Sequence, residues 1–219
     1  MGEDCVATFL AEIGRLSFLG APERELSRRG YRFVAGVDEV GRGCLAGPVV
    51  AAAIILPPGF WWPAVDDSKK TDAVTREVLD PVLRSRAVSF AIAEASAVEI
   101  DDTDIARASL LAMRRALEAL SPQPDVVLTD AFRVPGYLRP QVPMLQGDAN
   151  SLSIAAASIL AKVARDAMMD ELGRRWPAYG FGNHKGYAVE EHRKALAHAG
   201  PCPQHRLTFH GVVAEKLIP

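Results

Sequence analysis

The sequence has few cysteines and no long hydrophobic run, and both shortages narrow the class of protein. The three cysteines, Cys5, Cys44 and Cys202, are widely spaced and include no CxxC pair, which favours a reducing compartment over a disulfide framework. The longest apolar run, residues 48–58, is too short to span a bilayer. The first residues lack the basic start of a secretory signal. We therefore expect a cytoplasmic protein that is not bound to a membrane.

The sequence also lacks an excess of charge of either sign. Its 25 Lys and Arg residues nearly balance 27 Asp and Glu residues, which gives a formal net charge of -2. No global field would attract nucleic acid, so such binding would depend on local basic patches and bound cations. The 219 residues, 49% of them hydrophobic, contain no repeat or low-complexity linker and suffice for one core with a small extension. We expect a monomer.

The hydrophobic pattern predicts strands in the first half of the chain and alternating helices and strands in the second. The first three strands are joined by a glycine turn and by a polar stretch at residues 66–71, which favours antiparallel neighbours. This order predicts an α/β protein with a mixed sheet flanked by helices and a helical C-terminal part. The predicted strands are 34–40, 49–56, 87–95, 125–129 and 142–145. The predicted helices are 104–120, 150–174, with Asn150, Ser151 or Ser153 as its cap, and 189–199.

Asp38 and Glu39 are adjacent carboxylates near the end of the first predicted strand. The apolar residues before them place both at or near the core, where a charge needs a hydrogen-bond network, a basic side chain or a cation. No Lys or Arg lies in that run before Arg42. We predict a bound cation. Glu39 can share it with Asp38 only if the strand bends or frays, because neighbours on a regular strand point to opposite faces.

Asp130 and Asp148 are two further acids at positions where ligand sites form. Asp130 directly follows the strand 125–129, and Asp148 lies in a glycine-flanked loop just before the long helix. With Asp38 and Glu39 they supply four hard oxygen donors of the kind that Mg²⁺ or Mn²⁺ prefers. Each aspartate alone could instead be a turn or cap residue. Together they predict a two-metal site suited to phosphodiester displacement.

Five stretches of the chain, taken together, resemble type 2 ribonuclease H. The resemblance covers roughly residues 22–210. Departures from the family pattern at Cys44, Ala131, Gln146 and residues 209–212 remove none of the acids. The matching stretches are, in order, Val37-Asp38-Glu39-Val40-Gly41-Arg42-Gly43, Asp67-Ser68-Lys69-Lys70, Leu128-Thr129-Asp130, Gly147-Asp148 with residues 158–166, and Tyr179-Gly180-Phe181 with His184-Lys185-Gly186-Tyr187.

The resemblance implies a fold, a reaction and a set of catalytic residues. It implies a ribonuclease H-like catalytic domain over residues 1–174, with a helical segment at 1–30, and a helical extension over 175–219 packed on it. The implied enzyme hydrolyses the RNA strand of RNA/DNA hybrids and cuts 5′ of single ribonucleotides in duplex DNA. It would use two Mg²⁺ or Mn²⁺ ions and leave 5′-phosphate and 3′-hydroxyl ends. The implied catalytic and metal-binding residues are Asp38, Glu39, Asp130 and Asp148.

The resemblance also implies contacts with a nucleic acid substrate. The turn formed by Gly41, Arg42 and Gly43 would approach the ribose and, with Tyr187, sense the 2′-hydroxyl that distinguishes RNA from DNA. Taken alone, the turn could be a tight strand connection, the tyrosine a core-edge residue and the lysines part of a solvated loop. The residues implied to contact phosphates are Ser68, Lys69, Lys70 and Lys185.

Two alternative activities remain open at the level of sequence. The same fold could serve a nonhydrolytic protein that binds hybrid duplexes, or a metal-dependent nuclease that acts on DNA junctions. The C-terminal part could also hold a structural zinc ion, although only one of its four candidate ligands is a thiol. These candidates are His198, Cys202, His205 and His210.

Asp166 is an acid of a matching stretch that we do not expect to share the metal site. On a continuous helix it would lie about 20 Å further along the axis than the end near Asp148. Lys162 is four residues before it, so an ion pair on the helix surface is expected instead.

Overall fold

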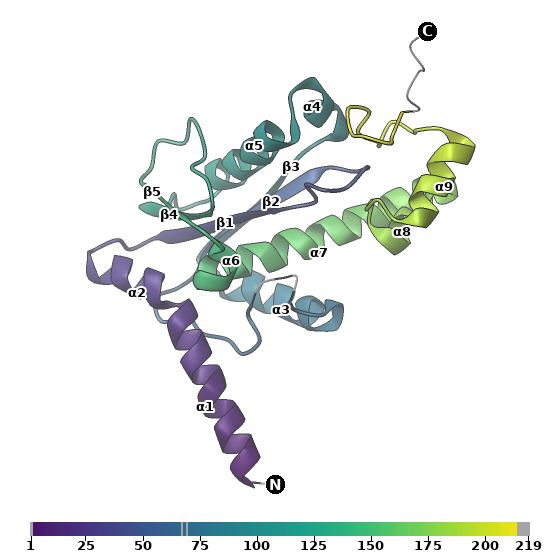
Figure 1. Cartoon of the computed structure of the whole chain (residues 1–219). Helices are drawn as coiled ribbons and strands as arrows, with labels where there is room; N and C mark the ends of the chain where they lie inside the picture. Colours follow the sequence, from purple (N-terminus) through teal and green to yellow (C-terminus); the bar gives the residue numbers. More distant parts are fainter. Residues whose placement is uncertain (1, 67, 69, 214–219) are drawn as a thin grey trace.

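A five-stranded mixed sheet forms the centre of the protein. The computed structural model describes residues 2–66, 68 and 70–213, with side chains from residue 8 onward. The strands lie in the order β3-β2-β1-β4-β5 (Figure 1). β2 is antiparallel to both β1 and β3, whereas β4 is parallel to both β1 and β5, which confirms the predicted mixed sheet. The bounds are Val34–Val40 for β1, Val49–Ile55 for β2, Ser89–Ala95 for β3, Val126–Asp130 for β4 and Gln141–Met144 for β5.

Helices cover both faces of this sheet. α5 (Ile105–Glu118) packs on one face, and α7 (Leu152–Arg175) crosses the other face, where α3 (Ala73–Arg86) packs against it (Figure 1). The first ten residues of α7 are therefore all buried, which explains why this part of the sequence is rich in alanine and has no charged residue. α7 also lies very close to β1. A Cβ atom at Gly36 would lie 2.2 Å from the carbonyl carbon of Ser153, so only glycine fits there.

Helical segments lie at both ends of the described chain, as predicted. α1 (Gly2–Leu19) and α2 (Ala21–Arg28) precede β1, whereas α8 (Phe181–His184) and α9 (Glu190–Ala199) follow α7 (Figure 1). α7 runs through the predicted domain boundary at 174/175, which stays a prediction. An apolar cluster joins the C-terminal part to the rest, formed by Ala46, Met169, Tyr179, Phe181 and Cys202. The short helices are α4 (Ala97–Asp102), α6 (Gly147–Asn150) and the 3-10 turn Pro177–Tyr179.

The segment between β2 and β3 differs from the prediction. We predicted only a polar link there, but the helix α3 begins after Asp72, whose side chain caps it by accepting a hydrogen bond from the Thr75 amide. Only Leu79 and Leu83 of α3 are buried, in a cluster shared with α7. Such a sparse apolar stripe does not stand out in sequence. β2 and β3 are antiparallel as predicted, although a helix rather than a short link joins them. α4 is a second helix that the prediction lacks.

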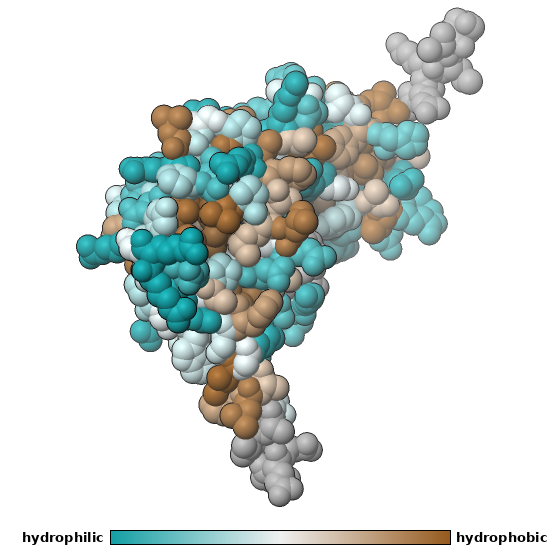
Figure 2. All heavy atoms as spheres, turned by 60° about the vertical axis from the view of Figure 1, so that its left-hand side comes forward, coloured by the Kyte–Doolittle hydropathy of each residue, from teal (hydrophilic) through white to brown (hydrophobic). Residues whose placement is uncertain are grey.

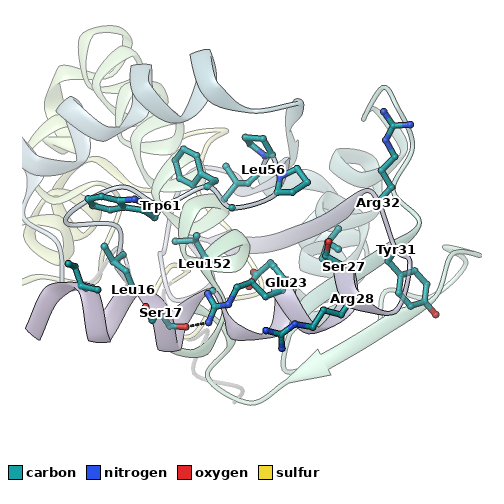
Figure 3. Close-up of a pocket in the computed structure, with 18 residues that line it drawn as sticks. Leu16, Ser17, Glu23, Ser27, Arg28, Tyr31, Arg32, Leu56, Trp61 and Leu152 are labelled. Atoms are coloured by element: carbon teal, nitrogen blue, oxygen red, sulfur yellow. Dashed lines mark hydrogen bonds between the residues drawn. The ribbon is translucent and has the colours of Figure 1, made fainter. Parts of the chain in front are cut away.

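A pocket of about 530 Å³ lies between α1, α2 and residues 56–61 (Figure 3). Trp61 and Leu152 belong to its largely apolar wall, and Arg28 and Arg32 line it at the end nearest β1. The neighbouring α1 carries several exposed apolar side chains, among them Phe9 and Phe18. Figure 2 shows brown, hydrophobic atoms gathered over this helix. None of the helices within the described ranges is both long and apolar enough to cross a membrane.

Candidate active site

Asp38 and Asp130 come from neighbouring parallel strands and share one face of the sheet. Val37 of β1 pairs with Thr129 of β4, so the two aspartates directly follow paired residues. Asp38 lies two residues after Gly36, and Asp130 lies two residues after Leu128. Gly36 and Leu128 both contact α7, so both aspartates are on the face of the sheet that α7 covers. The amide of Gly147 donates a 2.8 Å hydrogen bond to Asp130 Oδ1. This bond holds the start of α6, which carries Asp148, beside the end of β4.

Asp38 has an unfavourable electrostatic environment. Its side chain is 5% exposed, and burial, followed by the negative charges of Glu39 and then Asp130, raises its pKa well above the usual value. Hydrogen bonds from the Ser158 hydroxyl and the Glu39 amide only partly offset these effects. Asp38 thus lies within electrostatic reach of two further carboxylates. Such a group gains most from a bound cation.

Glu39 lies beside this cluster and has a basic partner of its own. The pairing of β1 with β2 continues regularly through Glu39 and Val40, so the strand does not bend or fray where we required it to. Glu39 instead pairs with Arg42, at 3.0 Å between Oε1 and Nη1. Regular alternation directs its side chain away from Asp38, and its role as a metal ligand stays a prediction.

The side chains of these acids are of the type that binds a divalent cation, although they are not already arranged around one point. Asp38, Asp130 and Asp148 supply hard carboxylate oxygens, and Asp148 is nearly as buried as Asp38. Within the part of the chain that the structure describes, no three His, Cys, Asp or Glu side chains already converge as a metal-binding group. Like charges repel one another, so carboxylates that lie near each other gain from a divalent cation between them.

The glycine turn and the segment that carries Tyr187 lie next to each other, and their role in sensing a 2′-hydroxyl stays a prediction. The amide of Leu45, just after the turn, donates a 2.8 Å hydrogen bond to the carbonyl of Gly186. The Tyr187 side chain is 42% exposed, and burial followed by the nearby Cys44 raises its pKa. Gly41 has φ +94°, and a Cβ atom there would lie 2.1 Å from Arg165 Nε. Glycine is therefore required at this position.

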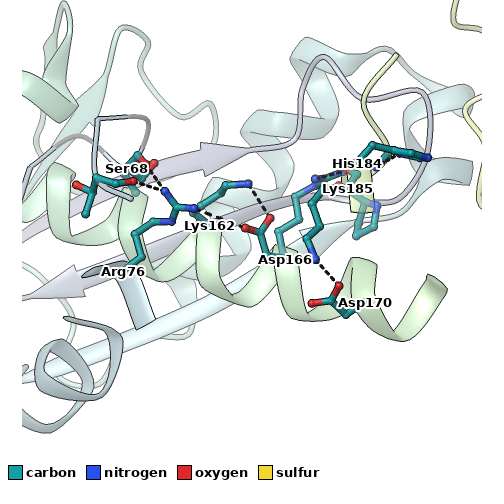
Figure 4. A network of polar contacts seen from close by, with 12 residues as sticks. Ser68, Arg76, Lys162, Asp166, Asp170, His184 and Lys185 are labelled. Carbon is teal, nitrogen blue, oxygen red and sulfur yellow. Dashed lines mark hydrogen bonds and ion pairs between the residues drawn. The ribbon is translucent and has the colours of Figure 1, made fainter. Parts of the chain in front are cut away.

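The residues predicted to contact phosphates differ in their exposure and in their partners. Ser68 is buried, and its hydroxyl lies 2.6 Å from that of Ser158, the residue that hydrogen-bonds Asp38. Lys70 is exposed, whereas Lys185 is paired with Asp170 (Figure 4). Lys69 lies outside the described residues. Contact of these residues with phosphate stays a prediction.

Asp166 lies apart from the acid cluster, as expected. Lys162 Nζ lies 2.7 Å from Asp166 Oδ1 on the surface of α7 (Figure 4), which confirms the predicted ion pair. Arg76 of α3 is 4.0 Å from the same carboxylate. These contacts give Asp166 basic partners of its own, and its exclusion from the metal site stays a prediction.

The zinc alternative is not supported by the geometry of its four candidates. His205 Nε2 lies 3.0 Å from Nε2 of His192, and its Nδ1 accepts a hydrogen bond from the Cys202 amide. His198 and His210 are exposed, whereas Cys202 and His205 are buried. The buried His192–His205 pair is instead a structural contact between α9 and the segment after it.

Three residues that contact the predicted site had no predicted role. Ser158 and Arg165 lie in a stretch that carries the family resemblance, but nothing in their spacing reveals what they touch. Arg206 lies outside the five stretches, yet its guanidinium contacts the glycine turn. A fully buried arginine leaves no periodic signal in sequence, and only the tertiary structure identifies it.

Comparisons with known proteins show the family to which this chain belongs. A family model described as Ribonuclease HII matches residues 35–212. The chain is 53% identical over 190 residues to the Ribonuclease HII of Syntrophotalea carbinolica, which covers 87% of this chain and 91% of the relative. It is 50% identical to the Ribonuclease HII of Moorella thermoacetica over 89% of this chain and 95% of the relative.

Solved structures share the fold. The ribonuclease H2 from Pyrococcus horikoshii is 25% identical, with a TM-score of 0.67 over 82% of this chain and 95% of that one. Bst-RNase HIII, solved in complex with Mn²⁺, is 18% identical, with a TM-score of 0.61 over 82% of this chain and 68% of that one. These likenesses confirm the ribonuclease H-like architecture. Because the family model spans most of the chain and its relatives are about half identical to it, this protein belongs to the ribonuclease HII family.

Proposed function

We propose that this protein is an endoribonuclease that hydrolyses the RNA strand of RNA/DNA hybrids. We further propose that it cuts 5′ of single ribonucleotides embedded in duplex DNA and leaves 5′-phosphate and 3′-hydroxyl ends. The observation that carries the proposal is the environment of Asp38, a buried carboxylate under the influence of Glu39 and Asp130. This environment occurs in a chain of the ribonuclease HII family.

Asp38, Glu39, Asp130 and Asp148 would hold the Mg²⁺ or Mn²⁺ ions. Two bound ions would supply an activated water and stabilise the leaving oxygen. The protein itself contributes the orientation of the ligands. Ser158 donates a hydrogen bond to Asp38, and the Gly147 amide fixes one oxygen of Asp130.

Substrate selection would depend on the turn formed by Gly41, Arg42 and Gly43 together with Tyr187. Their proximity supports joint contact with one ribose, because Leu45 is hydrogen-bonded to Gly186. A site whose polar groups require a hydroxyl rejects the deoxy form strongly. We also propose that Ser68, Lys69, Lys70 and Lys185 hold the duplex through its phosphates, and that the protein acts as a cytoplasmic monomer.

The test is a DNA duplex that contains one ribonucleotide, incubated with Mg²⁺ or Mn²⁺, with and without EDTA. We expect a single cut on the 5′ side of the ribonucleotide, no cut with EDTA, and no cut in the matching all-DNA duplex. Binding without cleavage would indicate the nonhydrolytic alternative. Cleavage of an all-DNA junction would indicate the DNA junction nuclease, and either result would overturn the proposal.

A further inference from the structure

Arg165 of α7 is fully buried, and its guanidinium donates to three backbone carbonyls and also hydrogen-bonds the side chain of Cys44. Its Nε and Nη2 donate to Pro48 and Ala46, at 3.0 and 3.2 Å, on the segment that follows the glycine turn. Its Nη1 donates to the carbonyl of Lys185, at 3.0 Å, two residues before Tyr187. One guanidinium therefore ties together the two segments that form the proposed ribose sensor.

Arg206 is equally buried and holds the turn itself. Its Nη2 donates to the carbonyl of Gly41 at 2.7 Å, and its Nη1 donates to that of Arg42 at 2.8 Å. Its Nε and Nη2 both donate to the carbonyl of Gly47, at 3.0 and 2.9 Å. Arg206 thus holds the turn and also Gly47, four residues after the turn, from inside the protein.

These two buried cations hydrogen-bond carbonyl dipoles rather than carboxylates. Burial, the largest effect, lowers the pKa of Arg206 to about 10, so the side chain stays positive near neutral pH. Burying a guanidinium is tolerable only when its N–H donors are hydrogen-bonded. Here the backbone carbonyls accept those hydrogen bonds. The turn is thus held by hydrogen bonds to Arg206 and lies against Arg165, so two positive charges are beneath it.

The orientation of the carbonyls determines where the amides point. In a trans peptide the N–H points opposite to the C=O. Because the carbonyls of Gly41 and Arg42 face Arg206, the N–H groups of Arg42 and Gly43 face outward. Neither N–H has a hydrogen-bond acceptor among the described residues, and both residues are exposed. Adjacent free N–H groups over positive charge form a donor site for ribose or phosphate oxygens.

We propose that Arg165 and Arg206 are positioning residues for the substrate ribose. They direct the amides of Arg42 and Gly43 toward the ribose, and they fix the position of Tyr187 relative to these amides. This inference rests on the proposed function, because it assumes a ribonucleotide at this site. Lysine cannot replace arginine here, because an ammonium has three donors and lacks the planar fork that reaches several carbonyls at once.

The test measures discrimination in binding, separately from cleavage. In an Asp38→Asn background, affinities are measured with Mg²⁺ for two duplexes that differ by a single 2′-hydroxyl. We expect Arg165→Lys and Arg206→Lys each to reduce the preference for the ribonucleotide duplex by roughly tenfold, which corresponds to about one lost hydrogen bond. Arg115→Lys is the control, since Arg115 also donates to a backbone carbonyl, that of Glu94, but far from the turn in sequence.

A merely structural role would lower the thermal midpoint and weaken the binding of both duplexes equally. Unchanged discrimination in folded variants would therefore overturn the inference, as would a parent protein that binds both duplexes equally. The proposed function is judged separately, by cleavage with the unmodified enzyme, so either idea can fail alone.

A second pair of variants tests whether the outward amides of the turn recognise the ribose, in case the lysine variants do not fold. The Cys44 amide lies 3.4 Å from the Gly41 carbonyl, so Arg42 occupies the second position of a β-turn, where proline is well tolerated. Arg42→Pro removes one outward N–H, whereas Arg42→Ala removes the same side chain and keeps the N–H. We expect the proline variant to discriminate several-fold less than the alanine variant. Equal discrimination would overturn the inference.

Discussion

The hydroxyl oxygens of Ser68 and Ser158 lie 2.6 Å apart inside the protein, and Ser158 also hydrogen-bonds the carboxylate of Asp38. Ser68 is therefore linked through Ser158 of α7 to the central acid of the site. A hydrogen bond to the charged form of a carboxylate lowers its pKa, so this chain of hydroxyls helps to keep Asp38 ionised.

Ser158→Ala should shift the activity of the enzyme to higher pH. Loss of the hydroxyl removes a contact that lowers the pKa of Asp38, so ionisation and metal binding would need more alkaline conditions. We expect kcat/KM at pH 7 to fall roughly tenfold, as for one lost hydrogen bond, and to recover at alkaline pH. The control is Ser109→Ala, which removes a buried hydroxyl bonded to Ile105 within α5. An unshifted pH profile in Ser158→Ala would contradict this role.

Asp38→Asn should abolish cleavage with Mg²⁺, leave duplex binding intact and stabilise the metal-free protein. The pKa of Asp38 is raised in the folded state, so the folded protein loses stability as pH rises from the ordinary carboxylate range through that raised value. A neutral amide removes this loss at neutral pH. We expect a thermal midpoint higher by roughly a few degrees and no further rise on addition of Mn²⁺. A lower midpoint than that of the metal-free wild type would contradict the electrostatic account.

Tyr187→Ala should impair cleavage at single ribonucleotides more than cleavage of long hybrids. A long hybrid offers many ribonucleotides and alternative registers, whereas a single 2′-hydroxyl depends on every contact that senses it. We expect kcat/KM to fall by roughly a hundredfold on the single-ribonucleotide duplex, which is about 3 kcal/mol, and by much less on the hybrid. Tyr31→Ala, next to the pocket by α2, serves as the control. Equal losses on both substrates would argue against a sensing role.

Acidification should destabilise the C-terminal part through the buried histidine pair. Burial, followed by the charge of His192, lowers the pKa of His205 from 6.5 to about 4. Between these two values the unfolded chain binds a proton that the folded protein excludes, so stability is full above pH 6.5 and falls as pH approaches 4.

The predicted size of this effect is about 2 kcal/mol between pH 7 and 5, because one pKa unit corresponds to about 1.4 kcal/mol. Urea unfolding at both pH values measures it. His205→Asn should flatten the pH dependence, whereas His198→Asn, at an exposed position, should not. The same slope in the His205 variant and the wild type would rule out this histidine as the cause.

Local pattern was sufficient for most of the sheet and for the long helices. Runs of β-branched residues predicted β1 and β2, and the amphipathic spacing of residues 104–120 predicted α5, whose cap the structure shows to be Asp104. The pattern failed for α3, whose helix depends on packing against α7 rather than on a strong apolar stripe of its own. For the N-cap of α7 the sequence left three candidate residues, and in the structure the cap is Ser151.

The sequence alone determined which functional groups the protein has and where they lie along the chain. It showed the carboxylates at the ends of strands, the glycines in the turns and the motifs that indicate the family. These are local properties, since they depend on residue type and short spacing. Only the tertiary structure decided that Asp38 and Asp130 share the α7 face, that Glu39 pairs with Arg42, and that Arg165 and Arg206 hold the glycine turn. Such contacts join residues up to 165 positions apart, and side-chain hydrogen bonds over that distance depend on packing that no local pattern encodes.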